Sequence, residues 1–186
     1  IYEIRYDYDL NDTKITIPEG CILNFNGGSI NNGLIEYNIK DLNFLIGEIK
    51  TNNLRINCYP SGNSWNTTVP ILNLSILSFG SINDKSQELH LTPLWNNFYN
   101  FVRNITYNTS IKINLTIPTA VWYITDIMFV PFGVNIDFCN SELHIDDVVT
   151  GDYIIYLGAD KDYYINNSQK PNEEDKYRAE CYQRNV

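Results

Sequence analysis

A gapless sequence repeat constrains the fold of this chain more than any other feature. Residues 17–30 and residues 130–143 both match the pattern [I/V]-P-x-G-x-x-[I/L]-[N/D]-F-x-x-x-x-[I/L]. In each copy a strand ends at a β-branched residue, Pro and Gly form a turn, and a second strand alternates apolar and polar residues. A third, partial copy begins at Ile117 and Pro118. Each copy is therefore predicted to form a strand, a tight turn and a strand.

The same rhythm continues after the first copy. Apolar clusters recur roughly every ten residues, with Asn and Gly between them, which suits either a β-sandwich or a solenoid of parallel strands. The gapless repeat favours the solenoid, because stacked coils repeat the same corners and Asn tolerates a left-handed conformation there. The clusters are Leu34-Ile35, Leu42-Phe44-Leu45-Ile46 and Leu54-Ile56.

The composition also favours an all-β protein with many turns. The chain is 44% hydrophobic, 13% aromatic and only 19% charged, and it is rich in Asn and Ile but very poor in Ala. β-Branched and aromatic residues fit strands, and Asn fits the turns between them. The same proportions exclude a disordered chain.

One amphipathic helix is predicted near residues 92–103. Thr92 is expected to be its N-cap, and Pro93 takes the first helical position. An open solenoid end exposes apolar rows and strand edges, so we expect this helix to cap the first coil of the second repeat run. The alternative is an ordinary surface helix on a sandwich. The predicted apolar face consists of Leu94, Trp95, Phe98, Phe101 and Val102.

Charge and hydropathy restrict the possible partners. A net charge of −9 and a pI near 4.6 oppose binding to nucleic acid, which requires Lys and Arg to neutralise phosphates. The most apolar stretch, residues 127–134, is short and contains Pro131 and Gly133, so no membrane insertion is expected. The chain starts at Ile1 without a signal segment, and we interpret it as an excerpt of a longer protein.

The cysteines do not form a metal-binding motif. Cys21, Cys58, Cys139 and Cys181 are widely spaced, and the only other soft ligands are His90 and His144. We therefore expect no metal site and no cofactor. Two disulfides remain an alternative, but buried free thiols are preferred because the cysteine density is low.

Paired carboxylates would be the expected catalytic groups of a polysaccharide-cleaving enzyme. Asp137 alternates with apolar neighbours and corresponds to Asn24 in the first repeat, so it is interpreted as a solvated strand residue. Asp146 and Asp147 are adjacent and would point to opposite faces of a strand. No catalytic residue is predicted. The carboxylates considered are Asp137, Glu142, Asp146, Asp147 and Asp152.

Two further groups of residues are candidates for binding. Trp65 is a loop aromatic and a possible glycan contact, although core or interface packing is preferred for it, while Trp95 and Trp122 are assigned to the core. Gly27-Gly28-Ser29 is interpreted as a coil corner rather than a phosphate loop, since neither a helix nor a Lys follows.

The N-terminal tyrosines suggest a contact surface. Tyr2, Tyr6 and Tyr8 alternate along one expected strand and form an aromatic face that is too rich for water. The alternative is that these side chains cover the first coil of the same chain.

The order of these segments resembles the opening of pectate-lyase-like right-handed parallel β-helix proteins. Residues 2–30 are similar to segments of tail fibres and tailspikes in phages of gut Bacteroidetes, the crAss-like phages included. The segments that carry the first resemblance are Ile76–Asp84, the helix, Ile117-Pro118 with Trp122–Ile124, and Val130-Pro131 with Val134, Ile136, Phe138 and Leu143.

The resemblance implies an all-β fold that starts a right-handed parallel β-helix and carries one capping helix. Residues 1–75 would form an N-terminal β-rich attachment segment, and residues 76–186 would hold the capping helix and first coils. The implied function is a structural, non-enzymatic part of a phage tail that attaches the virion to its host. Its implied partners are two identical subunits in a homotrimer, other tail proteins and, through the parent chain, host surface polysaccharide. The alternatives are a polysaccharide lyase or glycosidase and a secreted monomeric adhesin.

Overall fold

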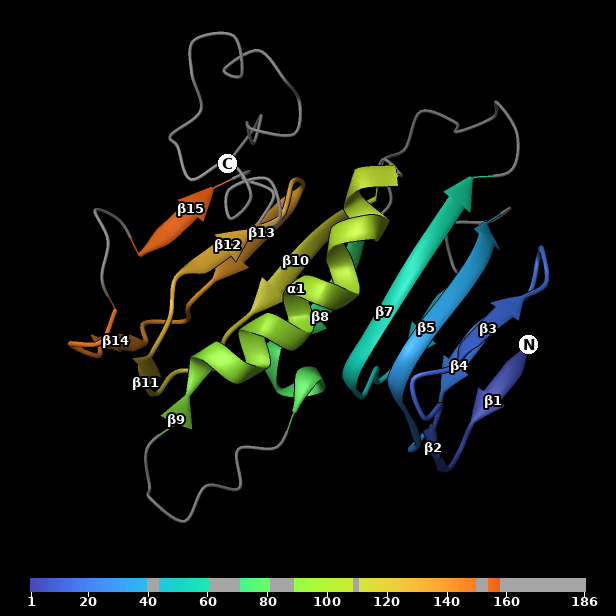
Figure 1. Ribbon diagram of the computed structural model, residues 1–186, viewed down its shortest axis with the longest axis horizontal. Coiled ribbons are helices and arrows are strands. Elements are labelled where there is room, and N and C mark those ends of the chain that lie inside the picture. Colours follow the sequence, from blue (N-terminus) through green and yellow to red (C-terminus); the bar gives the residue numbers. More distant parts are fainter. Residues whose placement is uncertain (40–43, 61–70, 81–88, 109–110, 150–153, 158–186) are drawn as a thin grey trace, which may run out of the picture.

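The computed structural model describes residues 1–39, 44–60, 71–80, 89–108, 111–149 and 154–157 (Figure 1). Within these ranges the chain is mostly β, with one long helix, α1 (Leu91–Asn108), and one short 3₁₀ helix, η1 (Ile76–Phe79). The strands before α1 are β1 (Tyr2–Ile4), β2 (Asp7–Asp9), β3 (Lys14–Ile17), β4 (Leu23–Phe25), β5 (Ser29–Ile39), β6 (Leu45–Gly47), β7 (Thr51–Pro60), β8 (Ile71–Ser75) and β9 (Leu89–His90). The strands after it are β10 (Lys112–Thr116), β11 (Val121–Ile124), β12 (Met128–Val130), β13 (Val134–Asp137), β14 (Glu142–Ile145) and β15 (Ile155–Leu157).

All strand pairs that the structure describes are parallel. Before α1, Asn31 of β5 pairs with Asn52 of β7, 21 residues further on. After α1, Asn114 of β10 pairs with Asn135 of β13, again at a distance of 21 residues. The all-β prediction is confirmed, and the sandwich alternative is wrong for the described strands because sandwiches pair their strands antiparallel.

The parallel strands fall into two runs with α1 between them (Figure 1). In the first run, β4 lies between β1 and β6, and the long strand β5 pairs with β2, β3 and β7. In the second run, β10 lies between β8 and β13, β11 lies between β9 and β14, and β12 pairs with β15. Each sheet thus collects strands that are far apart in sequence, as parallel pairing requires.

The predicted strand, turn and strand units are confirmed in both copies of the repeat. Strand β3 is followed by a turn in which the Cys21 backbone N donates to the Pro18 carbonyl at 3.2 Å, and β4 follows. Gly20 has φ 76°, and its counterpart Gly133 has φ 75°. The same left-handed conformation at the same motif position explains why glycine stands there in both copies.

Asparagine occupies left-handed corners, as the sequence predicts. Asn11, Asn32 and Asn53 have φ values of 48°, 52° and 49°. Asn32 and Asn53 interrupt the otherwise continuous pairing of β5 with β7 at the same level. The chain therefore turns the same corner repeatedly with the same residue type.

The prediction of a single N-terminal strand is wrong. Strand β1 ends at Ile4 and pairs with β4, whereas β2 begins at Asp7 and pairs with β5 of another sheet. The corner between them lies over Gly28, where a Cβ atom would come within 2.3 Å of the Tyr6 carbonyl oxygen. The interpretation of Gly27-Gly28-Ser29 as a corner is consistent with this close approach.

Helix α1 is longer than predicted at its C-terminal end. It continues to Asn108 because Ile105 extends the apolar face and is fully buried. Thr92 lies inside the first turn rather than at the N-cap, and its Oγ1 accepts a hydrogen bond from the Thr125 backbone N at 2.9 Å. The predicted apolar face is confirmed, since Leu94, Trp95, Phe98, Phe101 and Val102 are all buried.

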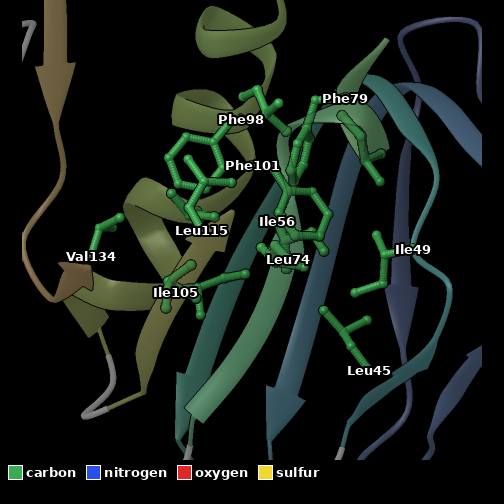
Figure 2. Close-up of a cluster of buried hydrophobic side chains, with 14 of the residues drawn as sticks. Leu45, Ile49, Ile56, Leu74, Phe79, Phe98, Phe101, Ile105, Leu115 and Val134 are labelled. Atoms are coloured by element: carbon green, nitrogen blue, oxygen red, sulfur yellow. The ribbon is translucent and has the colours of Figure 1, made fainter. Parts of the chain in front are cut away.

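The prediction that α1 packs on the second run is confirmed, but the helix covers the first run as well. The helix contacts β10, β11 and β12 of that run, but it packs most extensively on β7, the last strand of the first run. Figure 2 shows Phe98 and Phe101 close to Phe79 of η1, and each of the two ring centroids lies 5.4 Å from that of Phe79. The helix therefore joins the two runs through one apolar layer.

One hydrophobic core runs through the described chain, from Ile4 to Val134. Figure 2 shows part of this core. The core includes Ile56 of the first run and Leu115 of the second. Strand β8 lies before the expected boundary at residue 76, yet it pairs with β10 beyond that boundary. The division into residues 1–75 and 76–186 stays a prediction.

Candidate functional site

The N-terminal end of the first run exposes three tyrosines, which we call the end surface: Tyr2, Tyr6 and Tyr8. Tyr6 is 71% exposed and Tyr2 is 51% exposed. Tyr2 is in register with Leu23, and Tyr8 with Ile30, both of which are buried. Leu23 and Ile30 belong to rows of buried side chains that run from strand to strand. Tyr2 and Tyr8 are the last members of these rows, and no strand of the described chain covers them on this side.

The charged groups beside the end surface are held by local contacts. Glu3 accepts a hydrogen bond from Arg5 Nε at 2.6 Å, and Asp7 Oδ1 accepts one from Ser29 Oγ at 2.8 Å. Hydrogen bonds from the Asn11 backbone and the Asn32 side chain lower the pKa of the exposed Asp9 carboxyl. These contacts order the polar border of an otherwise aromatic surface.

A second candidate is a column of rings on the outward face of the β9, β11 and β14 sheet. His90, Tyr123 and His144 occupy one row of this sheet. The ring centroids of His90 and Tyr123 are 5.9 Å apart, and those of Tyr123 and His144 are 5.2 Å apart. His144 Nε2 lies 2.7 Å from Glu142 Oε1. From the sequence alone, these two histidines are considered only as soft metal ligands.

The pairing of Tyr123 with His144 could have been predicted from the sequence, because these residues are separated by the same 21 residues as other paired strand positions. Tyr123 and His144 are paired in neighbouring strands in the same way as Trp122 and Leu143. Their alternation with these inward residues marks them as outward. His90 could not have been found in this way, because α1 lies between β9 and β11.

The candidate carboxylates make local contacts and do not converge on a site in the described chain. Asp137 Oδ1 accepts from the Cys139 backbone N at 2.9 Å, and Asp146 Oδ1 accepts from the Val148 backbone N at 2.9 Å. Both are exposed turn-forming groups, as is common for Asp. Glu142 contacts His144, Asp147 is exposed in a turn, and Asp152 lies outside the described residues.

Two of the three tryptophans lie in the described part of the chain, and both are buried. Trp95 and Trp122 are each 1% exposed, and their indole N–H groups donate to the carbonyls of Phe129 at 3.0 Å and Pro118 at 2.9 Å. Their assignment to the core is confirmed. Trp65, the possible glycan contact, lies outside the described residues.

Three cysteine thiols are free, and burial is confirmed for one of them. Cys58 is buried, whereas Cys21 and Cys139 are half-buried, and Cys181 lies outside the described residues. The described ranges bring no three metal-ligating side chains together. Helix α1, the long helix of the described part, lacks the extent of apolar sequence that a membrane span requires.

Comparison of the chain with protein-family models, curated proteins and solved structures finds no match. Within the described residues, the exposed tyrosines of the end surface form the strongest candidate site.

Proposed function

We propose that this chain is the N-terminal part of a bacteriophage tail fibre or tailspike, with an architectural role in attaching the virion to its host. Its parallel strands are proposed to be the first coils of a right-handed parallel β-helix. The observation that carries the proposal is the same step of 21 residues in the pairs β1–β4 and β5–β7 before α1 and in the pairs β10–β13 and β11–β14 after it. An equal step supports continuous stacking, and right-handed crossovers are the rule for parallel strands.

Helix α1 supports this architectural role. It packs on the last strand of the first run and on three strands of the second run, and its apolar face is fully buried. A helix in this position covers sheet edges that would otherwise invite aggregation. In the proposed protein, it makes the attachment segment and the β-helix into one stiff unit.

The end surface is the proposed contact with the rest of the virion. Exposed aromatic side chains that continue core rows favour burial against another protein. Closed three-fold symmetry allows identical chains to satisfy one another without open-ended growth. We therefore propose a homotrimer that is mounted on other tail proteins, with host polysaccharide bound through the parent chain.

Light scattering on the chain of 186 residues tests the assembly part of the proposal. The expected species is a trimer, and Tyr6→Ser should shift it towards the monomer. Tyr123→Ser on the distant outward row is the matched control and should leave the trimer unchanged. A dimer would contradict the symmetry, and a monomer at high concentration would remove the end surface from the trimer interface.

A glycan screen tests the architectural role itself. Incubation of the same chain with bacterial capsular polysaccharides should leave them intact. Cleavage would overturn the architectural proposal in favour of a lyase or glycosidase. Density for this chain at the tail of an intact virion would establish its location and identify the protein on which it docks.

A further inference from the structure

Two Asn-Gly pairs occur close together in the sequence, Asn26-Gly27 and Asn32-Gly33. Such pairs are chemically labile, because the glycine nitrogen carries no neighbouring side chain that hinders its attack on the asparagine amide. The two pairs are chemically identical in sequence, so any difference in their reactivity in the folded chain must come from their surroundings.

The surroundings of Asn26-Gly27 leave it free to react. Asn26 is exposed, and the structure shows no hydrogen bond to its side chain within the described chain. Gly27 has φ 91°, and no described residue other than its two chain neighbours has an atom within 4 Å of the position that a Cβ would take. The described residues also provide no hydrogen-bond acceptor for the Gly27 backbone N. The nucleophile, the amide and the space for a ring are therefore all available.

The surroundings of Asn32-Gly33 hold it in place. Asn32 Nδ2 donates to Asp9 Oδ2 at 3.0 Å, and the Asn32 carbonyl accepts from the Asp12 backbone N at 2.8 Å. Gly33 is paired with Leu54 inside strand β5. A Cβ on Gly33 would lie 2.7 Å from the Leu10 Cβ, so there is no room around this peptide.

We propose that Asn26 is a site of spontaneous deamidation and isoaspartate formation, and that the fold protects Asn32 from the same reaction. The Gly27 nitrogen attacks Asn26 Cγ and forms a C–N bond, while the bond from Cγ to the amide nitrogen breaks. The Asn26 side-chain amide nitrogen takes up the proton of the Gly27 nitrogen and leaves as ammonia. The Gly27 nitrogen stays in the ring of the resulting cyclic succinimide. Water then opens the ring at one of its two carbonyls and yields aspartate or isoaspartate without any redox change.

The product would disturb the corner below the end surface. The backbone nitrogens of Asn26 and Gly28 both donate to the Ile4 carbonyl, at 3.0 Å and 3.1 Å. Isoaspartate adds one methylene to the main chain between these two donors, so they cannot both keep this acceptor. Gly28 has no space to absorb the change, because it already packs against the Tyr6 backbone. The modification therefore loosens β1 and the corner at Tyr6.

Peptide mapping by mass spectrometry tests this inference in the intact chain. The folded protein is incubated at neutral pH, and the peptide of residues 15–40 is fragmented to separate modification at Asn26 from modification at Asn32. Modification at Asn26 should accumulate several-fold faster than at Asn32. In urea, where the contacts of Asn32 are lost, the two rates should become similar. Equal rates in the folded chain, or faster reaction at Asn32, would overturn the proposal.

Matched variants separate the two sites without relying on fragmentation. Asn26→Gln should reduce the isoaspartate signal of the folded chain to background, because glutamine does not form the five-membered ring. Asn32→Gln should leave the signal unchanged. The opposite pattern would refute the assignment. The test is independent of the assembly proposed above, since it needs only the folded chain.

Discussion

The side-chain amide of Asn97 in α1 donates a hydrogen bond to Oδ1 of Asn52 in β7 at 2.7 Å, across 45 residues of sequence. The Asn52 backbone N in turn donates to Oδ1 of Asn31 in β5 at 2.9 Å. A second amide pair joins the same helix and strand, from Asn104 Nδ2 to Asn57 Oδ1 at 2.6 Å. Asn31 and Asn52 thus form a row of hydrogen-bonded asparagines across neighbouring strands of the first run. Asn97 of α1 continues this row on the side of β7 where a further strand would lie.

A double-mutant cycle measures the first of these links. Asn97→Ala and Asn52→Ala should show a coupling of about 1 kcal/mol in the free energy of unfolding, the usual net worth of such a hydrogen bond. Asn100→Ala is the matched control on the same helix, since the described chain offers its side chain no hydrogen-bond partner. It corrects for the helix propensity that alanine adds. A coupling of zero from urea titrations would mean that the pair does not hold the helix.

Removal of the Trp95 ring should destabilise the junction between the runs. Trp95→Ala empties a fully enclosed site and is expected to cost about 3 to 5 kcal/mol. Trp95→Phe keeps most of the ring volume but removes the indole N–H that donates to the Phe129 carbonyl, so we expect the smaller ring and the lost hydrogen bond together to cost about 1 to 3 kcal/mol. Circular dichroism during thermal unfolding measures both. An unchanged melting temperature for Trp95→Ala would refute the packing role of the helix.

Replacement of either repeat glycine should carry a similar cost, because both have the same conformation. Gly20→Ala and Gly133→Ala place a Cβ at φ near 75°, for which we expect about 1 to 2 kcal/mol each. Neither site has an atom closer than 3.5 Å to that Cβ, so the backbone alone sets the cost. Gly28→Ala, which collides with the Tyr6 carbonyl, should cost clearly more. A smaller effect at Gly28 than at Gly20 would contradict this order.

Stability should fall above pH 9.0 because two buried groups resist ionisation. Burial raises the pKa of the Cys58 thiol above its ordinary 9.0, and burial followed by the nearby Cys21 and Cys58 raises the pKa of the Tyr37 hydroxyl above 10.0. Above these values the unfolded chain loses protons that the folded chain keeps, so the stabilisation present below pH 9.0 is lost as the pH rises.

Two variants separate the contributions of Cys58 and Tyr37 to this loss of stability at high pH. Cys58→Ala should flatten the part of the decline that begins at pH 9.0, and Tyr37→Phe the part that begins at pH 10.0. Urea titrations on both sides of these values provide the measurement. A wild-type stability that does not change through this range would disprove the assignment.

The features that the sequence predicts correctly are local ones. A Pro-x-Gly turn depends on two residues, and the buried face of α1 depends on spacing within one helix, so both can be read without knowledge of the fold. The end of α1 was missed because Ile105 lies in a polar setting, between Asn104 and Thr106. There the Thr106 hydroxyl bonds back to the Val102 carbonyl at 3.3 Å, which only the helical conformation allows.

The features that were missed depend on register between distant strands. Asn73 and Asn114 are hydrogen-bonded neighbours in β8 and β10 although 41 residues separate them. No local pattern reveals such a pairing, because α1 and β9 lie between the two strands. The position of His90 beside Tyr123 could not be predicted for the same reason. These two residues become neighbours only because β9 pairs with β11 across the intervening helix.

The even spacing of the left-handed corners at Asn11, Asn32 and Asn53 limits how the length of this chain can vary. A deletion of one residue between two corners would turn every later side chain of that strand to the opposite face, and buried isoleucines would meet solvent. Loss or gain of a complete repeat preserves both the corner and the alternation. Related genes should therefore differ in this region by duplication or removal of whole repeats, and single-residue insertions should be confined to the corners themselves.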